Sequence, residues 1–142
     1  GLYGFSVATE MGLEQVSTLK SIISQIKSVN KGESVGYGRN FMAERDLTVG
    51  VVPIGYADGL RRDLGYRGIS FLVNGSEAPV LGNICMDMCM IDISGIKARE
   101  GDEVLVFGRE KSVTGLAEKL GTIPYELLAG LSERVKRVYF QE

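Results

Sequence analysis

The chain has 142 residues, a formal net charge of -2 and no histidine. This length suits a single domain, and the near-neutral charge gives no electrostatic reason to expect a nucleic acid or an anionic membrane surface as partner. Without histidine, a self-contained Ser-His-Asp or Cys-His catalytic site is excluded, so acid-base chemistry would depend on Tyr, Lys, Asp, Glu or a group from outside the chain.

Neither a membrane span nor a signal peptide is indicated by the hydrophobic pattern. No apolar run reaches the roughly 18 residues that a membrane span needs, and the chain does not begin with a charged and then apolar segment. The cytoplasm is therefore the expected location.

The first part of the chain gives mixed signals. Residues 1–10 are small and Gly-rich, as in a linker or the end of another element. In residues 19–29 the spacing of apolar residues favours a helix, whereas the Ile, Val and Ser content and the short length allow a bulged strand. Periodicity alone favours the helix. The following NKGES predicts a turn, with Gly32 available for a positive φ.

Most of the remaining chain has the composition of β-strands, separated by turn signals such as VNGSE and AREGDE. The β-rich segments are 47–55, 69–73, 78–94, 102–108 and 134–140. Short strands at this spacing predict a barrel or a sandwich. Segment 78–94, treated as one strand, is apolar on both faces, so we expect it to be buried on both sides.

Both cysteines lie in segment 78–94. On a continuous strand, Cys85 and Cys89 would share a face about 13 Å apart, which is too far for a disulfide. Two thiols without histidine also make a poor metal site. We therefore interpret them as reduced cysteines of a core or an interface, and we expect no bound metal.

Two short helices are predicted near the C-terminus. In SVTGLAEKLG, Ser112 or Thr114 is available as the N-cap and Gly121 as the stop. In PYELLAGLS, Pro124 occupies the first turn, where its missing N–H costs nothing.

Several residues in marked surroundings have an ordinary structural interpretation when each is taken alone. A tyrosine beside glycine usually covers flexible backbone, an aspartate in YADG bonds its own turn, paired arginines are solvated, and a methionine in a strand belongs to the core. The residues concerned are Tyr37, Tyr56, Tyr125, Asp58, Arg61, Arg62 and Met86. None of these signals is specific by itself.

Taken together and in order, the motifs resemble the C-terminal domain of bacterial alanine racemases, which use pyridoxal phosphate (PLP). The motifs are VGYG, IGYADGLRR, GNICMDMCMID, GDEVLVFG and TIPYELL. GYADG followed about thirty residues later by ICMD is highly distinctive. The resemblance implies a mainly β, barrel-like domain over 11–142, with 1–10 as the end of a preceding barrel and 19–29 as strand. The ending RVKRVYFQE is similar to racemase domains fused to a cell-wall ligase.

The resemblance also implies roles for individual residues. Tyr37 corresponds to the second catalytic base, which removes or returns the α-proton on the L-alanine side. Tyr56 and Arg61 correspond to residues of the substrate entrance, and Met86 to a residue that contacts substrate through its backbone. Tyr125 corresponds to the tyrosine that binds the phosphate of the cofactor.

Two positions depart from the family pattern. The serine that precedes the catalytic tyrosine is Gly36 here, a small change that we expect to be tolerated. The usual arginine three residues before the CMD methionine is Asn83 here, which removes a charge near the entrance. The choice between alanine, serine and a broader range of amino acids therefore stays open.

A tyrosine base needs help to ionise. A free tyrosine has a pKa of about 10 and is only about 0.1% phenolate at pH 7. Lowering that pKa by two to three units takes roughly 3–4 kcal/mol of favourable charge contacts. No cation stands beside Tyr37 in the sequence, so the help is expected from outside the chain, and the glycine neighbours would let the ring project into a partner's pocket.

Half of the implied active site is missing from these residues. The Schiff-base lysine of the family lies in the N-terminal barrel, and the arginine that contacts the PLP ring would precede Gly1. The resemblance implies a head-to-tail homodimer, in which the tyrosine of one chain reaches the cofactor of the other, and a link to D-alanine for peptidoglycan. The chain alone is expected to be inactive. A non-catalytic β-barrel used for assembly or ligand binding is the alternative from another class.

Overall fold

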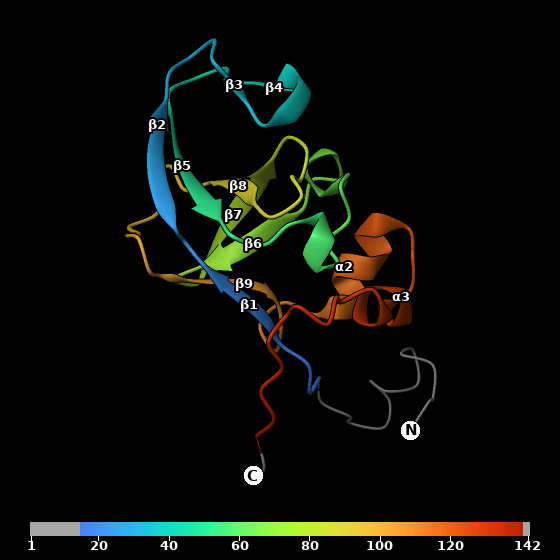
Figure 1. The fold of residues 1–142 in the computed structure, drawn as a ribbon. Coiled ribbons are helices and arrows are strands. Elements are labelled where there is room, and N and C mark those ends of the chain that lie inside the picture. Colours follow the sequence, from blue (N-terminus) through green and yellow to red (C-terminus); the bar gives the residue numbers. More distant parts are fainter. Residues whose placement is uncertain (1–14, 141–142) are drawn as a thin grey trace.

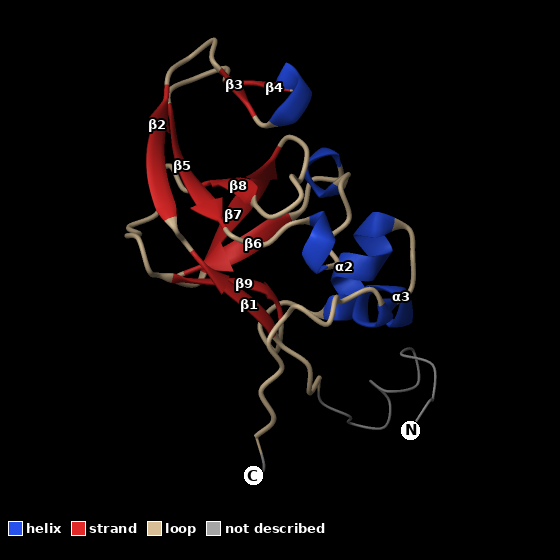
Figure 2. Cartoon of the chain, viewed as in Figure 1, coloured by secondary structure: helices blue, strands red, loops and turns tan. Residues whose placement is uncertain are grey.

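The computed structural model describes residues 15–140, apart from the side chain of Tyr37, and consists of one curled antiparallel sheet with short helices along one side (Figures 1 and 2). In spatial order the strands of the sheet are β1 (Leu19–Ile22), β9 (Glu103–Phe107), β6 (Ser70–Val73), β7 (Ser76–Leu81), β8 (Cys89–Asp92), β5 (Leu47–Val52) and β2 (Gln25–Val29). A separate two-stranded ribbon, β3 (Ser34–Val35) and β4 (Phe41–Met42), projects beyond β2 and β5. The mainly β, barrel-like prediction is confirmed.

The first and last strands of this sheet, β1 and β2, are two halves of one bent segment (Figure 1). At the bend, the N–H of Ile23 donates to Asp102 O beside β9 (2.9 Å), and the N–H of Ser24 donates to Val51 O on β5 (2.8 Å). Strand rather than helix over 19–29 is therefore confirmed. The helix-like spacing arises because a bulge after Leu19 and the bend after fully buried Ile23 interrupt the alternation of a strand.

Segment 78–94 is not one strand but a hairpin, which corrects the prediction. β7 and β8 pair in antiparallel fashion, with Val80 opposite Ile91, and residues 82–88 form the connecting loop. The chain reverses because Gly82 adopts a φ of +64° and the N–H of Cys85 donates to Met88 O at 2.9 Å. The two cysteines therefore do not share one strand face.

The predicted β-rich segment 134–140 also needs correction, because it forms no strand in the described part of the chain. Its large apolar residues Val138, Tyr139 and Phe140 are all exposed. A strand requires a neighbouring strand for its backbone hydrogen bonds, and none of the described strands pairs with this segment. The other three segments contain β5, β6 and β9 as predicted.

The local turn and cap signals are confirmed. Gly32 has a φ of +87°, and the β6–β7 hairpin turns at Asn74 and Gly75, both with positive φ, as a two-residue hairpin prefers. Helix α2 (Val113–Leu120) is capped by Ser112, whose hydroxyl accepts from the N–H of Gly115, and it ends at left-handed Gly121. Helix α3 (Pro124–Ala129) begins with proline.

Buried apolar side chains form two clusters. The larger one fills the curled sheet and extends under α2 and α3, with Phe71, Ile91 and Val104 fully buried. The smaller one lies under the β3–β4 ribbon and consists of Val35, Ala43, Leu47, Val49 and Leu81. Among the described residues, no helix is both long and apolar enough to cross a membrane.

Candidate functional site

Two of the sequence motifs are joined by backbone hydrogen bonds. We call residues 55–59 the GYADG turn and residues 82–88 the CMD loop. The N–H of Tyr56 donates to Cys85 O at 3.0 Å, and the N–H of Ala57 donates to Met86 O at 2.9 Å. A Cβ atom on Gly55 would lie 2.3 Å from the carbonyl oxygen of Met86, so only glycine allows this approach.

A third motif, residues 36–38, which we call the GYG turn, packs against the CMD loop. Gly36 and Gly38 have φ values of +80° and +77°, a backbone region that favours glycine. A Cβ on Gly36 would lie 3.6 Å from Asn83 O and 3.3 Å from the Cε of Met90. Three motifs that are distant in the sequence therefore meet, and the two departures from the family pattern, Gly36 and Asn83, lie next to each other.

Tyr37 is held at this meeting point by its backbone. It begins a single 3-10 turn that ends at Arg39, and β3 and β4 pair on either side of that turn. The side chain of Tyr37 lies outside the described part of the structure, so its role as a base stays a prediction.

Met86 and Tyr56 are exposed on the surfaces of their loops, with 53% and 46% of each residue accessible. The interpretation of Met86 as a core side chain is therefore wrong. Its carbonyl oxygen is engaged by Ala57, whereas nothing within residues 15–140 accepts a hydrogen bond from its N–H. The N–H is thus the backbone polar group of Met86 that has no acceptor among the described residues.

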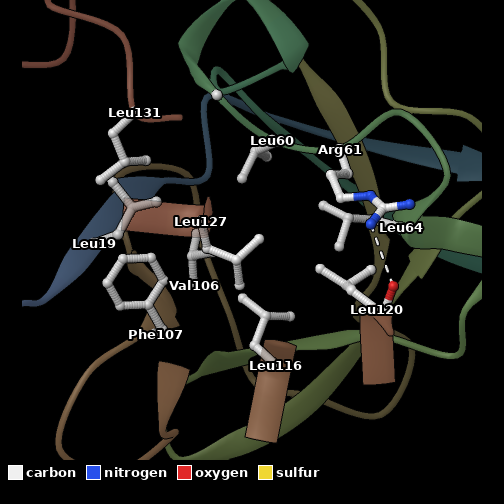
Figure 3. A pocket seen from close by; sticks show the side chains of 11 residues that line it. Leu19, Leu60, Arg61, Leu64, Val106, Phe107, Leu116, Leu120, Leu127 and Leu131 are labelled. Carbon is white, nitrogen blue, oxygen red and sulfur yellow. Dashed lines mark hydrogen bonds between the residues drawn. The ribbon is translucent and has the colours of Figure 1, made fainter. Parts of the chain in front are cut away.

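Arg61 lies in a different setting from its solvent-exposed neighbour Arg62. Its Nε and Nη2 donate to the two carboxylate oxygens of Asp63, each at 3.1 Å, and its Nη1 donates to Leu120 O at 3.2 Å (Figure 3). Burial acts to raise the pKa of Asp63, but hydrogen bonds from Arg61 and then Arg67 outweigh it and hold that pKa below its ordinary value. The interpretation of Arg61 as a solvated residue is wrong, because its guanidinium ties the GYADG region to the end of α2.

The cavity beside Arg61 is part of the apolar core and not a ligand site. Figure 3 shows leucine, valine and phenylalanine side chains from β1, β9, α2 and α3 pointing into it. Its volume is about 20 Å³, which is room for roughly one water molecule and far too little for an amino acid or a cofactor.

Tyr125 follows Pro124 in the first turn of α3 and is 36% accessible. Its role as the tyrosine that binds the cofactor phosphate stays a prediction. The other end of α3 touches the GYADG turn, because a Cβ on Gly59 would lie 2.4 Å from Gly130 O. Helix α3 and the GYADG turn are therefore held in one packed unit.

The sequence analysis missed an ion-pair cluster that spans two motifs. The Nε of Arg134 lies 2.9 Å from Asp58 Oδ1, and its Nη2 lies 2.6 Å from Asp87 Oδ1. Asp58 Oδ2 accepts from the N–H of Gly55 at 2.8 Å, so this aspartate bonds the backbone three residues before it and not two residues after it. An aspartate in each motif and a basic run near the C-terminus were the only signals in the sequence.

Both cysteines are free thiols, Cys85 partly exposed in the CMD loop and Cys89 buried in β8. Burial, with a smaller contribution from the charge of Cys85, raises the pKa of Cys89 to about 12. Cys89 is therefore a protonated core residue at neutral pH. No group of three or more His, Cys, Asp or Glu that could hold a metal ion is present among the described residues.

Comparisons with known proteins all point to one family. The family model described as alanine racemase, C-terminal domain, matches residues 16–139. The alanine racemase of Helicobacter acinonychis is 45% identical over 148 residues, a match that covers 97% of this chain and 39% of that protein. The crystal structure of the biosynthetic alanine racemase from Pseudomonas aeruginosa matches with a TM-score of 0.85 and 38% identity, over 94% of this chain and 37% of that one.

A further solved structure shows a bound cofactor. The alanine racemase from Bartonella henselae, crystallised with covalently bound pyridoxal phosphate, matches with a TM-score of 0.82 and 31% identity. That match covers 87% of this chain and 34% of the Bartonella chain. The present chain thus spans well under half the length of these relatives.

Proposed function

The chain belongs to the family of alanine racemase C-terminal domains, and from that premise we propose that it is part of a PLP-dependent racemase that interconverts L- and D-alanine. The observation that supports this most is the meeting of the GYG turn, the GYADG turn and the CMD loop at one place. A barrel that served only for assembly would not require three distant motifs to approach this closely.

In this proposal Tyr37 exchanges the α-proton on the L-alanine face of the substrate. Bound PLP would supply the electron sink for the negative charge that develops at the α-carbon. Tyr37 would hold or release the proton at its phenol oxygen. The cofactor beside it would be carried by the other subunit of a homodimer. Glycines with positive φ, Gly36 and Gly38, flank Tyr37 in the backbone.

The other residues bind and orient. The N–H of Met86 would donate to the substrate, and Tyr56 and Arg61 would line the entrance, with Arg61 held by Asp63 and Leu120 O. Tyr125 would donate its hydroxyl to the cofactor phosphate. The lysine that carries PLP would belong to an N-terminal barrel of the same protein, outside these residues.

The wider setting follows from the same proposal. The complete enzyme would act in the cytoplasm and supply D-alanine for peptidoglycan. Residues 11–142 would form the C-terminal domain, and residues 1–10, which lie outside the described residues, would be the end of the barrel. We expect the 142-residue chain to have no racemase activity without that barrel.

Asn83 favours a second candidate, a racemase that also accepts serine. It replaces the usual arginine and is 5% accessible, next to the GYG turn. Loss of a guanidinium beside the entrance would leave room for a polar side chain on the substrate. Rates measured side by side on L-alanine and L-serine decide between the two candidates.

Replacing Tyr37 with Phe in the complete protein tests the proposed function. We expect Tyr37→Phe to lower the rate of L-to-D conversion by about three orders of magnitude or more, because the proton acceptor is lost while the ring remains. Stopped-time assays of D-alanine give the rate, and mass spectrometry of the intact protein gives the PLP content, which should not change.

Tyr66→Phe is the matched control, since Tyr66 is an exposed tyrosine outside the three motifs. It should retain full activity. A Tyr37→Phe protein with near-normal turnover but a lowered melting temperature would show that Tyr37 serves packing, and the catalytic proposal would fail.

A further inference from the structure

Arg134 connects two loops that the sequence analysis treated separately. Its planar guanidinium forms an ion pair with Asp58 of the GYADG turn through Nε, and its Nη2 donates to Asp87 of the CMD loop. Arginine suits this arrangement because its donors form a rigid fork that can bind two carboxylates in fixed directions.

The two ends of this bridge differ in how firmly they are held. The side chain of Asp58 is 12% accessible, and its second oxygen caps the GYADG turn by accepting from Gly55. The side chain of Asp87 is 53% accessible, and Arg134 is its only side-chain partner within residues 15–140. Arg134 therefore extends from an anchored carboxylate to a loop that lacks other side-chain support at this point.

Hydrogen bonds also fix the position of the segment that carries Arg134. Directly after α3, the N–H of Ser132 donates to Asp58 O at 3.0 Å, and the hydroxyl of Ser132 accepts from the N–H of Arg134 at 3.3 Å. The segment also lies against Gly59, where no Cβ would fit. The position of the guanidinium is thus fixed by backbone contacts to the same turn that it binds.

We infer that Arg134 is a positioning residue, which holds the CMD loop in register with the GYADG turn so that the N–H of Met86 and the ring of Tyr56 face one substrate. This inference rests on the proposed function for the identity of the substrate. The contacts themselves do not depend on it. Arg134 acts through the two loops and need not touch the substrate.

A contribution to global stability does not explain this arrangement. The pair with Asp87 stabilises the fold very little, because both side chains are about half exposed, solvent screens their charges and they lose freedom. The hydrogen bond to Asp87, and then the charge of Asp58, raise the pKa of Arg134, so the guanidinium stays charged throughout the working pH range. Loss of Arg134 should therefore loosen one loop and leave the core unchanged.

Amide hydrogen exchange in the complete protein, with PLP bound, tests this inference. In Arg134→Met we expect peptides covering the GYADG turn and the CMD loop to exchange at least about tenfold faster, while peptides covering β6 and β9 are unchanged. Arg134→Lys should be intermediate, because an ammonium group can reach one carboxylate but not fork between two. Asp87→Asn should give the same pattern as Arg134→Met, and Arg137→Met, on the same segment, serves as the control with wild-type exchange.

Kinetics give a second readout. For Arg134→Met we expect KM for the amino acid to rise about five- to tenfold with kcat within about twofold, since substrate binding and not proton transfer is disturbed. In the double variant the two effects should not add, because Asp87→Asn removes a contact that Arg134→Met has already removed. Arg134→Lys should recover part of the KM.

Two results would overturn the positioning role: exchange in the two loops that stays at the wild-type rate, or exchange that rises equally in β6 and β9 together with a lower melting temperature. If the wild-type protein shows no racemase turnover, the proposed function fails. The exchange experiment still decides whether Arg134 holds the CMD loop.

Discussion

At Gly55 the absence of a side chain brings two loops into contact. The backbone there is extended, with a φ of -140°, a conformation that any residue can adopt. The constraint comes from the carbonyl oxygens of Cys85 and Met86, which would lie 2.4 and 2.3 Å from a Cβ atom. Both oxygens also accept hydrogen bonds from the next two residues of the turn, so neither can move away without breaking the contact.

Gly55→Ala should therefore separate the GYADG turn from the CMD loop. We expect a loss of roughly 1–3 kcal/mol in the free energy of unfolding, the range for an added methyl group in a packed site, together with a higher KM in the complete enzyme. Urea denaturation measures the first quantity. Gly115→Ala in helix α2 is the control, since a Cβ there would meet only the Ser112 hydroxyl. If the two variants were equally stable, the clash of a Cβ at Gly55 with the CMD loop would be contradicted.

Much of the candidate site is visible in the sequence at the scale of single residues, but the partners are not. The glycines of the motifs stand out because each occupies a positive-φ backbone or a close approach that a side chain would block, and Tyr37 and Tyr56 stand out because they lie beside them. Asp58 gave no sign that its partner would be Arg134, because an ion pair between distant segments leaves no local pattern. The exposure of Met86 was missed because the segment was treated as a continuous strand.

At the scale of elements, α2 is held on the sheet by one apolar face. Val113, Leu116, Ala117 and Leu120 are buried, while Glu118 and Lys119 face solvent. Leu116 and Leu120 line the small cavity against Phe107 and Leu127, so they connect the helix to β9 and α3 (Figure 3). Packing around the cavity therefore sets the position of both helices.

Leu120→Ala should destabilise the domain by about 2–5 kcal/mol, because it removes buried methyl groups next to a space that is already unfilled. The midpoint of urea unfolding measures the effect. Lys119→Ala, one residue earlier on the exposed face, should change stability by no more than about 0.5 kcal/mol. A Leu120 variant as stable as the Lys119 variant would mean that the helix is not anchored at this point.

Elements with a local signal were predicted well, and those defined by distant partners were not. A few adjacent residues determine the Asn-Gly hairpin, the Ser112 cap of α2 and the start of α3 at Pro124. The loop at 82–88 was hidden because apolar residues continue through it, and 134–140 has strand composition without a described strand beside it. For 19–29, family resemblance predicted correctly where periodicity did not.

At the scale of the whole molecule, carboxylates with lowered pKa values make the stability of the fold depend on pH. Hydrogen bonds from Arg61 and Arg67, which outweigh the opposing effect of burial, lower the pKa of Asp63, and hydrogen bonds from Asn74 and then Arg99 lower that of Asp102. A carboxylate whose pKa is lower in the folded state stabilises the fold above its unfolded pKa, and this stabilisation is lost as pH falls through the folded pKa.

We therefore expect Asp63→Asn to lower the melting temperature at about pH 6, and this difference to shrink towards about pH 2 as the wild-type carboxylate becomes protonated. Calorimetry across this pH range measures the two melting temperatures. Glu118→Gln, on the exposed face of α2, should not differ from wild type at either pH. If the difference in melting temperature between wild type and Asp63→Asn persisted in acid, the effect of Asp63 would come from packing and not from its charge.

The bend between β1 and β2 has a consequence for how the domain is assembled during synthesis. Residues 19–22 are synthesised some eighty residues before their partner β9, with Leu19 opposite Phe107. The curl cannot be completed until that late strand arrives, and contacts between such distant segments form slowly. The nascent chain must therefore keep β1 without its partner strand while the residues between β1 and β9 are synthesised.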